Sequence, residues 1–186
     1  MYEEFRKSYT VPPFVFKNYV DLTTEEATEV LKCRNDIEVR KWMTSTEEIP
    51  LENHLKYIEG LRTSERNFYW AVYQDGILQG GISLTGIADY HADSGIFLNP
   101  NLKKPGLGLL ISYISIDFYF TTLGIKRLYS VVNKENKKAI RMNQLLGSSF
   151  GSSNTDFIPV ELSINSWDSQ RKNLEKLFHT KNNIKN

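Results

Sequence analysis

The sequence pattern with the clearest chemical meaning is a glycine turn beside two lysines, at residues 103–108. The segment reads Lys-Lys-Pro-Gly-Leu-Gly, between a strand-like run and a long apolar run. Gly106 and Gly108 would let a ligand approach the backbone, and a helix that starts here presents unpaired N–H groups and its positive dipole end. Lys103 and Lys104 add positive charge. The pattern predicts a phosphate or pyrophosphate site, although glycines at such a junction also serve simply to make a turn.

A second group, suited to proton transfer, precedes the same strand-like run. Asp89, His91 and Asp93 alternate along a segment predicted to be a loop, and Asp93 is the candidate general base. Solvated loop residues would give the same pattern. The spacing could suggest a metal, but alternation on a loop disfavours that reading and no metal is predicted. Cys33 is the only cysteine, which excludes an intrachain disulfide, and its apolar helical face predicts a buried thiol.

Alternating strands and helices must position these groups. Thr23 and Glu26 form a capping-box pattern, Ser166 is expected to cap the last helix, and Gly147 closes the one before it. The order of elements predicts one α/β domain, with a mixed central sheet of about seven strands flanked by helices. Strands are expected at 14–20, 67–74, 77–87, 94–99, 126–133 and 160–164, and helices at 25–35, 37–43, 51–64, 107–122, 137–147 and 167–178. The domain core is expected over about 14–165, a C-terminal helix over about 166–179 and a loose tail over 180–186.

Bulk composition excludes several classes of protein. The chain has 186 residues, of which 40% are hydrophobic and 24% charged, so a folded single domain is expected. Its 23 basic and 22 acidic residues give a net charge of +1, which argues against a nucleic-acid partner. The most apolar stretch contains Asp117 and is too short to span a bilayer, and the N-terminus lacks a signal-peptide core. A cytoplasmic protein without a membrane partner is expected.

Two motifs at the right separation resemble the GNAT superfamily of N-acetyltransferases. Residues 103–108 are similar to its Arg/Gln-x-x-Gly-x-Gly/Ala pyrophosphate loop. Residues 136–147 are similar to its Asn-x-x-Ala-x-x-x-Tyr-x-x-x-Gly helix, and the agreement in element order covers roughly 14–165. The resemblance implies a GNAT fold and acetyl-CoA as cosubstrate. In this family the loop amides hold the coenzyme A pyrophosphate, and the preceding strand pairs with the pantetheine arm. The implied coenzyme site contains Ile96, Leu98, Lys103, Lys104, Gly106, Leu107, Gly108, Leu109 and Asn136.

This chain departs from the family pattern at two important positions. Pro105 removes one amide from the loop. Asn143 stands where many relatives have the tyrosine that protonates the departing thiolate, and an amide cannot donate that proton at neutral pH. Tyr129 or water is the expected substitute. A backbone amide near Ile96 is expected to polarise the thioester carbonyl.

A narrower resemblance concerns the acceptor side. The pattern Arg34-Asn-Asp, then Trp42-Met43, then His54-Leu is similar to N-acetyltransferases of pseudaminic acid biosynthesis, which acetylate the 4-amine of a UDP-linked 4-amino-4,6-dideoxy sugar. Related patterns occur in polyamine and protein-directed relatives. Arg34 can bind a diphosphate bidentately, and His54 can donate to phosphate or base. The predicted acceptor residues are Arg34, Met43, His54, Tyr57, Thr85 and Phe97.

Plain structural roles remain open for the same residues. Arg34 could neutralise a helix C-terminus, and His54, Trp42 and Met43 could pack in the core. The sequence therefore predicts an N-acetyltransferase of a nucleotide-linked amino sugar. It leaves open a protein N-terminal or polyamine acetyltransferase and a non-catalytic acyl-CoA-binding regulatory domain. A homodimer is possible.

Overall fold

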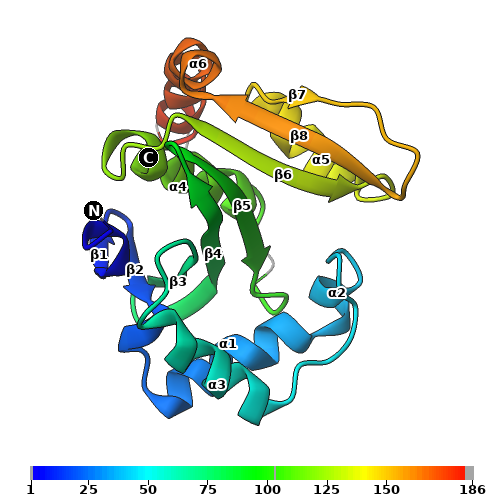
Figure 1. Cartoon of the computed structure of the whole chain (residues 1–186). Coiled ribbons are helices and arrows are strands. Elements are labelled where there is room, and N and C mark those ends of the chain that lie inside the picture. The colour runs from blue at the N-terminus through cyan, green and yellow to red at the C-terminus, as the bar shows by residue number, and fades with distance from the viewer. Residues whose placement is uncertain (1, 103, 183–186) are drawn as a thin grey trace.

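The computed structural model describes residues 2–102 and 104–182, which form a twisted sheet with helices on both faces (Figure 1). The strand order is β1-β2-β3-β4-β5-β6-β8-β7. Every neighbouring pair is antiparallel except β5 and β6, which run parallel. The strands are β1 (Tyr9–Val11), β2 (Phe14–Asn18), β3 (Phe68–Gln74), β4 (Ile77–Ala88), β5 (His91–Leu98), β6 (Arg127–Asn133), β7 (Ser149–Phe150) and β8 (Phe157–Ser163).

The helices divide between the two faces of the sheet. Helices α1 and α3 cover the β2–β4 part of one face, while α4, α5 and α6 pack on the other. The short α2 projects beside the open end of β5 (Figure 1). The helices are α1 (Thr24–Asn35), α2 (Ile37–Arg40), α3 (Leu51–Leu61), α4 (Leu107–Thr121), α5 (Lys137–Leu145) and α6 (Ile164–Asn182), with 3-10 turns η1 (Glu4–Arg6) and η2 (Tyr19–Asp21).

Strand β3 shows why two cores form. Successive side chains of a strand point to opposite faces. Trp70 is fully buried on the α4 side, where its ring meets that of Phe118, whereas Ala71 is buried with α1 and α3. The apolar α4 fills the first core, and no helix in the described part of the chain is long and apolar enough to cross a membrane.

Several local predictions are confirmed. The Thr23 hydroxyl accepts from the Glu26 amide at 3.2 Å, and the Glu26 carboxylate accepts from the Thr23 amide at 2.8 Å, which completes the capping box. Gly147 follows α5 with φ of 86°, in the left-handed region. Cys33 is buried, and burial raises the pKa of its thiol to about 11.

Other boundaries differ from the prediction. Two short edge strands, β1 and β7, raise the strand number to eight. The last helix begins at Ile164, and the Ser163 hydroxyl accepts from the Ser166 amide at 3.2 Å, so the prediction that Ser166 caps this helix is wrong. Helix α6 continues to Asn182, and residues 183–186 lie outside the described part of the chain.

Candidate active site

An opening forms where the parallel strands β5 and β6 separate. Their ladder joins only three residue pairs and ends at Asp93 and Tyr129. Beyond it the strands diverge (Figure 1), while β5 stays paired with β4 as far as Leu98. At the point of divergence the Ser94 hydroxyl donates to the Tyr129 carbonyl at 3.3 Å. The freed edge of β5 therefore presents backbone N–H and C=O groups with which an extended ligand can pair as a strand would.

The glycine turn stands at the start of α4, next to the end of β5. Gly106 is the N-cap residue and has φ of 84°, a conformation that strains other residues. A Cβ at Gly108 would lie 2.9 Å from Leu98 Cδ1, so the first turn of α4 contacts β5 directly. Glycine is therefore favoured at 106 by its positive φ and at 108 by the close approach of Leu98.

The loop amides are not equivalent. The Leu107 amide donates to the Lys104 carbonyl at 3.2 Å, inside the turn. The amides of Gly108 and Leu109 have no backbone carbonyl partner among the described residues, as expected for a helix N-terminus. Lys104 is exposed beside them, and Lys103 lies outside the described residues. The free amides and the helix dipole favour a bound anion.

Helix α5 brings two predicted residues toward the opening. The Asn136 side chain accepts from the Ala139 amide at 3.1 Å and so caps the helix. Asn143 donates to the Ala139 carbonyl at 3.0 Å. It also lines a small cavity of about 30 Å³ with Ser94 and Ser130, among apolar side chains of α4, β6 and β8. Asn143 therefore lies at the point where β5 and β6 diverge.

Tyr129 does not share that cavity. Its neighbour Ser130 lines the cavity, and adjacent residues of a strand point to opposite faces. Tyr129 is instead directly across from Asp93, which in turn pairs with Thr85 on β4. These three side chains form a row on the face that carries α1 and α3.

The predicted loop at 89–93 is wrong, and a tight turn explains the difference. Asp89 and Tyr90 both have positive φ, 49° and 65°, and connect the paired residues Ala88 and His91. Positive φ at both central residues defines the hairpin turn that matches strand twist, but tyrosine is an unusual residue for it. His91 and Asp93 thus belong to β5, and alternation on a loop was not a valid argument about metal binding. The described residues contain no cluster of three or more His, Cys, Asp or Glu arranged for a metal ion.

Arg34 has a hydrogen-bonding group without a partner. Its Nη2 donates to the Ser45 carbonyl at 3.3 Å, whereas Nη1 is buried and has no hydrogen-bond partner among the described residues. Burial lowers the pKa of Arg34, but a guanidinium stays charged at neutral pH. A buried donor on a cation is costly unless something binds it.

His54 and Phe97 gather around Tyr19, a residue that the sequence analysis missed. The Tyr19 and His54 rings lie 6.1 Å apart in an edge contact. His54 Nε2 is buried without a partner among the described residues, and burial lowers the pKa of His54. A Cβ at Gly81 would lie 3.1 Å from the Tyr19 hydroxyl and closer still to the Phe97 ring. Burial raises the pKa of Tyr19, whereas the positive charge of Arg34 lowers it.

Two side chains missed by sequence reasoning hold the segment 41–49 beside this cluster. Asn35 makes a double hydrogen bond with the backbone of Ile49, at 2.8 and 3.0 Å. Arg40 donates to the Thr46 carbonyl at 2.7 Å. Met43 lies half-buried in this segment. The Arg-Asn pattern therefore includes one arginine with a free donor and one asparagine that fixes the adjoining wall.

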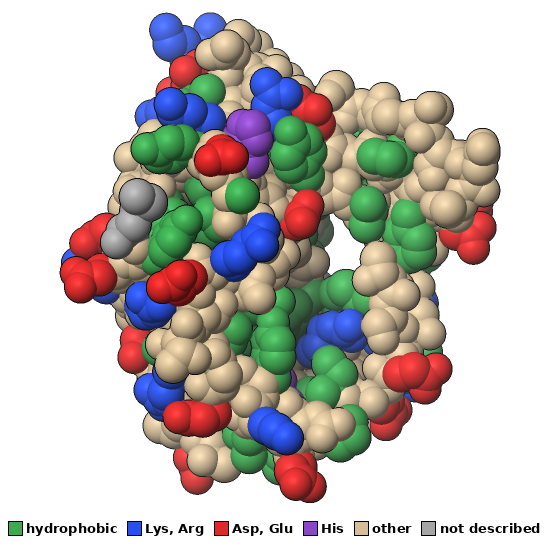
Figure 2. All heavy atoms as spheres, viewed as in Figure 1, with side chains coloured by type: hydrophobic (Ala, Val, Ile, Leu, Met, Phe, Trp, Pro, Cys, Tyr) green, Lys and Arg blue, Asp and Glu red, His purple; other side chains and the backbone are tan. Residues whose placement is uncertain are grey.

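Figure 2 shows the molecule hollowed between two lobes, with hydrophobic and basic side chains inside the hollow. Diverging strands, a glycine turn with free amides and a sheet face covered by α1 and α3 are together typical of an acyl-coenzyme A transferase. Residues 19–149 match the acetyltransferase (GNAT) domain family. The chain belongs to this family and is an acyl-CoA-dependent N-acetyltransferase.

Two kinds of acetyltransferase are among the named relatives. Acetyltransferase PseH of Campylobacter jejuni is 30% identical over 128 residues, which cover 69% of this chain and 80% of PseH. Spermidine N(1)-acetyltransferase of Escherichia coli is 36% identical over 88 residues, 46% of each chain. The crystal structure of C. jejuni PseH matches with a TM-score of 0.69 and 25% identity, over 82% of this chain and 99% of PseH. PseH has also been solved in complex with acetyl coenzyme A.

Proposed function

We propose that this enzyme transfers acetyl from acetyl-CoA to the 4-amino group of a UDP-linked 4-amino-4,6-dideoxy sugar. The observation that carries the proposal is the buried Nη1 of Arg34, in the last turn of α1, which has no hydrogen-bond partner among the described residues. A fixed cation there attracts a diphosphate and repels a polyamine. The resemblance of the Arg34…Trp42-Met43…His54 pattern to N-acetyltransferases of pseudaminic acid biosynthesis supports the same substrate class.

The coenzyme site fits acetyl-CoA. The free amides of Gly108 and Leu109, with Lys104 and the dipole of α4, would bind the pyrophosphate. The freed edge of β5 from Ile96 to Leu98 would pair with the pantetheine arm. Leu107 contributes less than the sequence suggests, because its amide already donates to the turn.

The residues of this chain can supply the base and the oxyanion donor, while water supplies the final proton. Asp93 is the proposed base, because its exposed carboxylate lies next to the point where β5 leaves β6, on the acceptor face. A backbone amide near Ile96 would stabilise the developing oxyanion. Water would protonate the thiolate near Asn143, since the Tyr129 side chain points to the other face.

A matched pair of variants tests the acceptor proposal. Arg34→Ala should raise KM for the sugar nucleotide by roughly 10- to 100-fold, the loss of a charge-assisted hydrogen bond, and leave acetyl-CoA affinity unchanged. Arg62→Ala serves as control, because Arg62 is exposed at the end of α3 and, among the described residues, forms an ion pair with Glu59 alone. Equal loss of both affinities, or loss of folding, would mean that Arg34 has only a structural role.

The proposal also covers location. A cytoplasmic enzyme is expected, because nucleotide sugars and acetyl-CoA are both cytoplasmic metabolites in the proposed reaction. Acetylation of protein N-termini and of polyamines is the competing proposal. An N-terminal peptide and a polyamine are therefore measured as acceptors beside the sugar nucleotide.

A further inference from the structure

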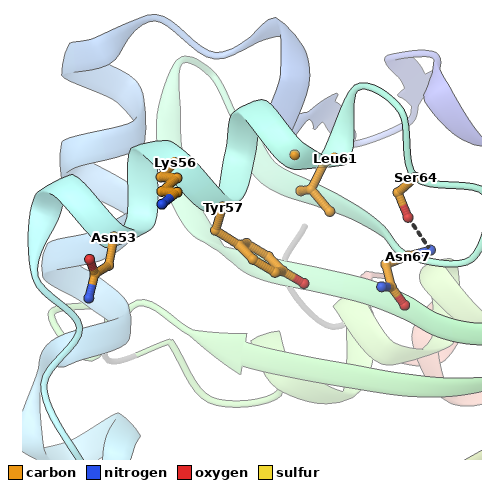
Figure 3. Close-up of a pocket in the computed structure, with 7 residues that line it drawn as sticks. Asn53, Lys56, Tyr57, Leu61, Ser64 and Asn67 are labelled. Carbon is orange, nitrogen blue, oxygen red and sulfur yellow. Dashed lines mark hydrogen bonds between the residues drawn. The ribbon is translucent and has the colours of Figure 1, made fainter.

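A cavity lies along α3, and Tyr57 is the one lining residue for which the sequence predicts an acceptor role. Its volume is about 420 Å³, within the range of small-molecule sites. Figure 3 shows Asn53, Lys56 and Tyr57 projecting from one side of α3, with Ser64 and Asn67 where the chain leaves the helix for β3. The lining residues are Asn53, Lys56, Tyr57, Gly60, Leu61, Ser64 and Asn67.

Contacts between rings connect this cavity to the acceptor cluster. The Tyr57 hydroxyl donates to the Tyr69 hydroxyl at 2.9 Å, and these two rings lie 5.6 Å apart. The Tyr69 ring lies 5.4 Å from that of Tyr19, which contacts His54. A chain of packed rings thus links the wall of the cavity to the Tyr19–His54 cluster.

At its other end, the cavity is connected to Asp93 through Asn67 and Gly86. The Asn67 side-chain oxygen accepts from the Gly86 amide at 3.1 Å. Gly86 also adjoins Asp93, whose carboxylate would be 3.2 Å from a Cβ at that position. An acceptor held near Asp93 can thus extend along α3.

The chemistry of the lining selects an anionic ligand with a planar group. Lys56 has no ion-pair partner among the described residues, and the lining contains no Asp or Glu, so a polyamine would meet repulsion without compensation. The Tyr57 ring is 46% exposed and available for stacking. The amides of Asn53 and Asn67 retain N–H donors and can read the edge of a base.

We infer that the α3 cavity binds the nucleobase end of the acceptor, with Tyr57 stacking on the base and Lys56 facing its phosphates. The inference rests on the proposed nucleotide-linked acceptor and adds the place where the nucleotide lies.

Calorimetric titration with UDP and with pyrophosphate tests the inference. Tyr57→Ala should weaken UDP binding by roughly tenfold or more, since stacking of one base is lost, and should leave pyrophosphate binding unchanged. Tyr57→Phe should bind UDP like the wild type, because the ring remains. Lys56→Ala should weaken both ligands by roughly fivefold, more at low salt. Lys172→Ala on the distant α6 is the matched control, and acetyl-CoA affinity verifies folding.

Two outcomes would overturn the inference, and they are distinguishable. In the first outcome, the wild type binds UDP and neither Tyr57→Ala nor Lys56→Ala changes the affinity. The α3 cavity would then not be part of the acceptor site, although the acceptor could still be a nucleotide-linked amine. Absence of UDP binding to the wild type at millimolar concentration would contradict the proposed function as well.

Discussion

Replacing Gly106 with aspartate puts a negative charge at the anion-binding end of α4. Among the described residues, no atom apart from those of the two neighbouring residues lies within 4 Å of a Cβ at Gly106. The new carboxylate therefore fits without a clash. The φ of 84° strains any side chain there by about 1–2 kcal/mol. Gly106→Ala carries the same strain without the charge, and is therefore the control for Gly106→Asp.

The charge effect can be worked from Coulomb's law. A carboxylate on the order of 5 Å from a pyrophosphate with two charges, at an effective dielectric constant of about 40–80, costs about 2–3 kcal/mol. Acetyl-CoA should therefore bind to Gly106→Asp roughly 30- to 150-fold more weakly than to Gly106→Ala. Both variants should lose a few degrees in Tm, about 2–4 °C per kcal/mol for a chain of this size.

Equilibrium titration with acetyl-CoA at two salt concentrations measures the difference. The difference in acetyl-CoA affinity between Gly106→Asp and Gly106→Ala should become smaller at high salt, because salt screens the interaction between exposed charges. Equal affinities for the two variants, with both folded, would refute the assignment of the pyrophosphate to this turn.

Three further predictions concern proton transfer and stability. Asn143→Ala should lower kcat by less than about tenfold, the weak end of general-acid effects. Tyr129→Phe should not lower kcat further. A roughly 10³-fold loss of kcat in either variant would contradict thiolate protonation by water. Asp93→Asn should lower kcat/KM by about 10²–10⁴-fold at neutral pH, while Asp89→Asn in the adjacent turn leaves it unchanged. Burial lowers the pKa of His54 below 6.5, so the unfolded chain binds an extra proton and stability falls as pH drops below about 6.5. His54→Gln should therefore make Tm depend less on pH between pH 7 and 5. The same dependence of Tm on pH in this variant and the wild type would show that His54 does not contribute.

The sequence predicted best where local rules act alone. The capping box at Thr23 and the glycine turn before α4 each depend on backbone geometry that a few residues specify. The glycine turn places the start of α4, to which the coenzyme pyrophosphate is proposed to bind.

Tertiary contacts set the features that the sequence could not supply. Tyr19 falls inside the strand predicted over 14–20 but lies in the turn η2, and only packing brings it to His54 and Phe97. The Asp89-Tyr90 turn lacks the usual glycine or asparagine, so the start of β5 was placed too late. The α3 cavity depends on the distance between a helix and a sheet, which no periodicity encodes.

The central claim is that an anionic nucleotide-linked amine is the acceptor. The most direct test compares kcat/KM for a UDP-linked 4-amino-4,6-dideoxy sugar, spermidine and an N-terminal peptide, by thiol release from acetyl-CoA. The account predicts a kcat/KM for the sugar nucleotide at least about tenfold above the other two, because charge and hydrogen bonding both discriminate. A kcat/KM for spermidine or the peptide equal to or above that of the sugar nucleotide would contradict it.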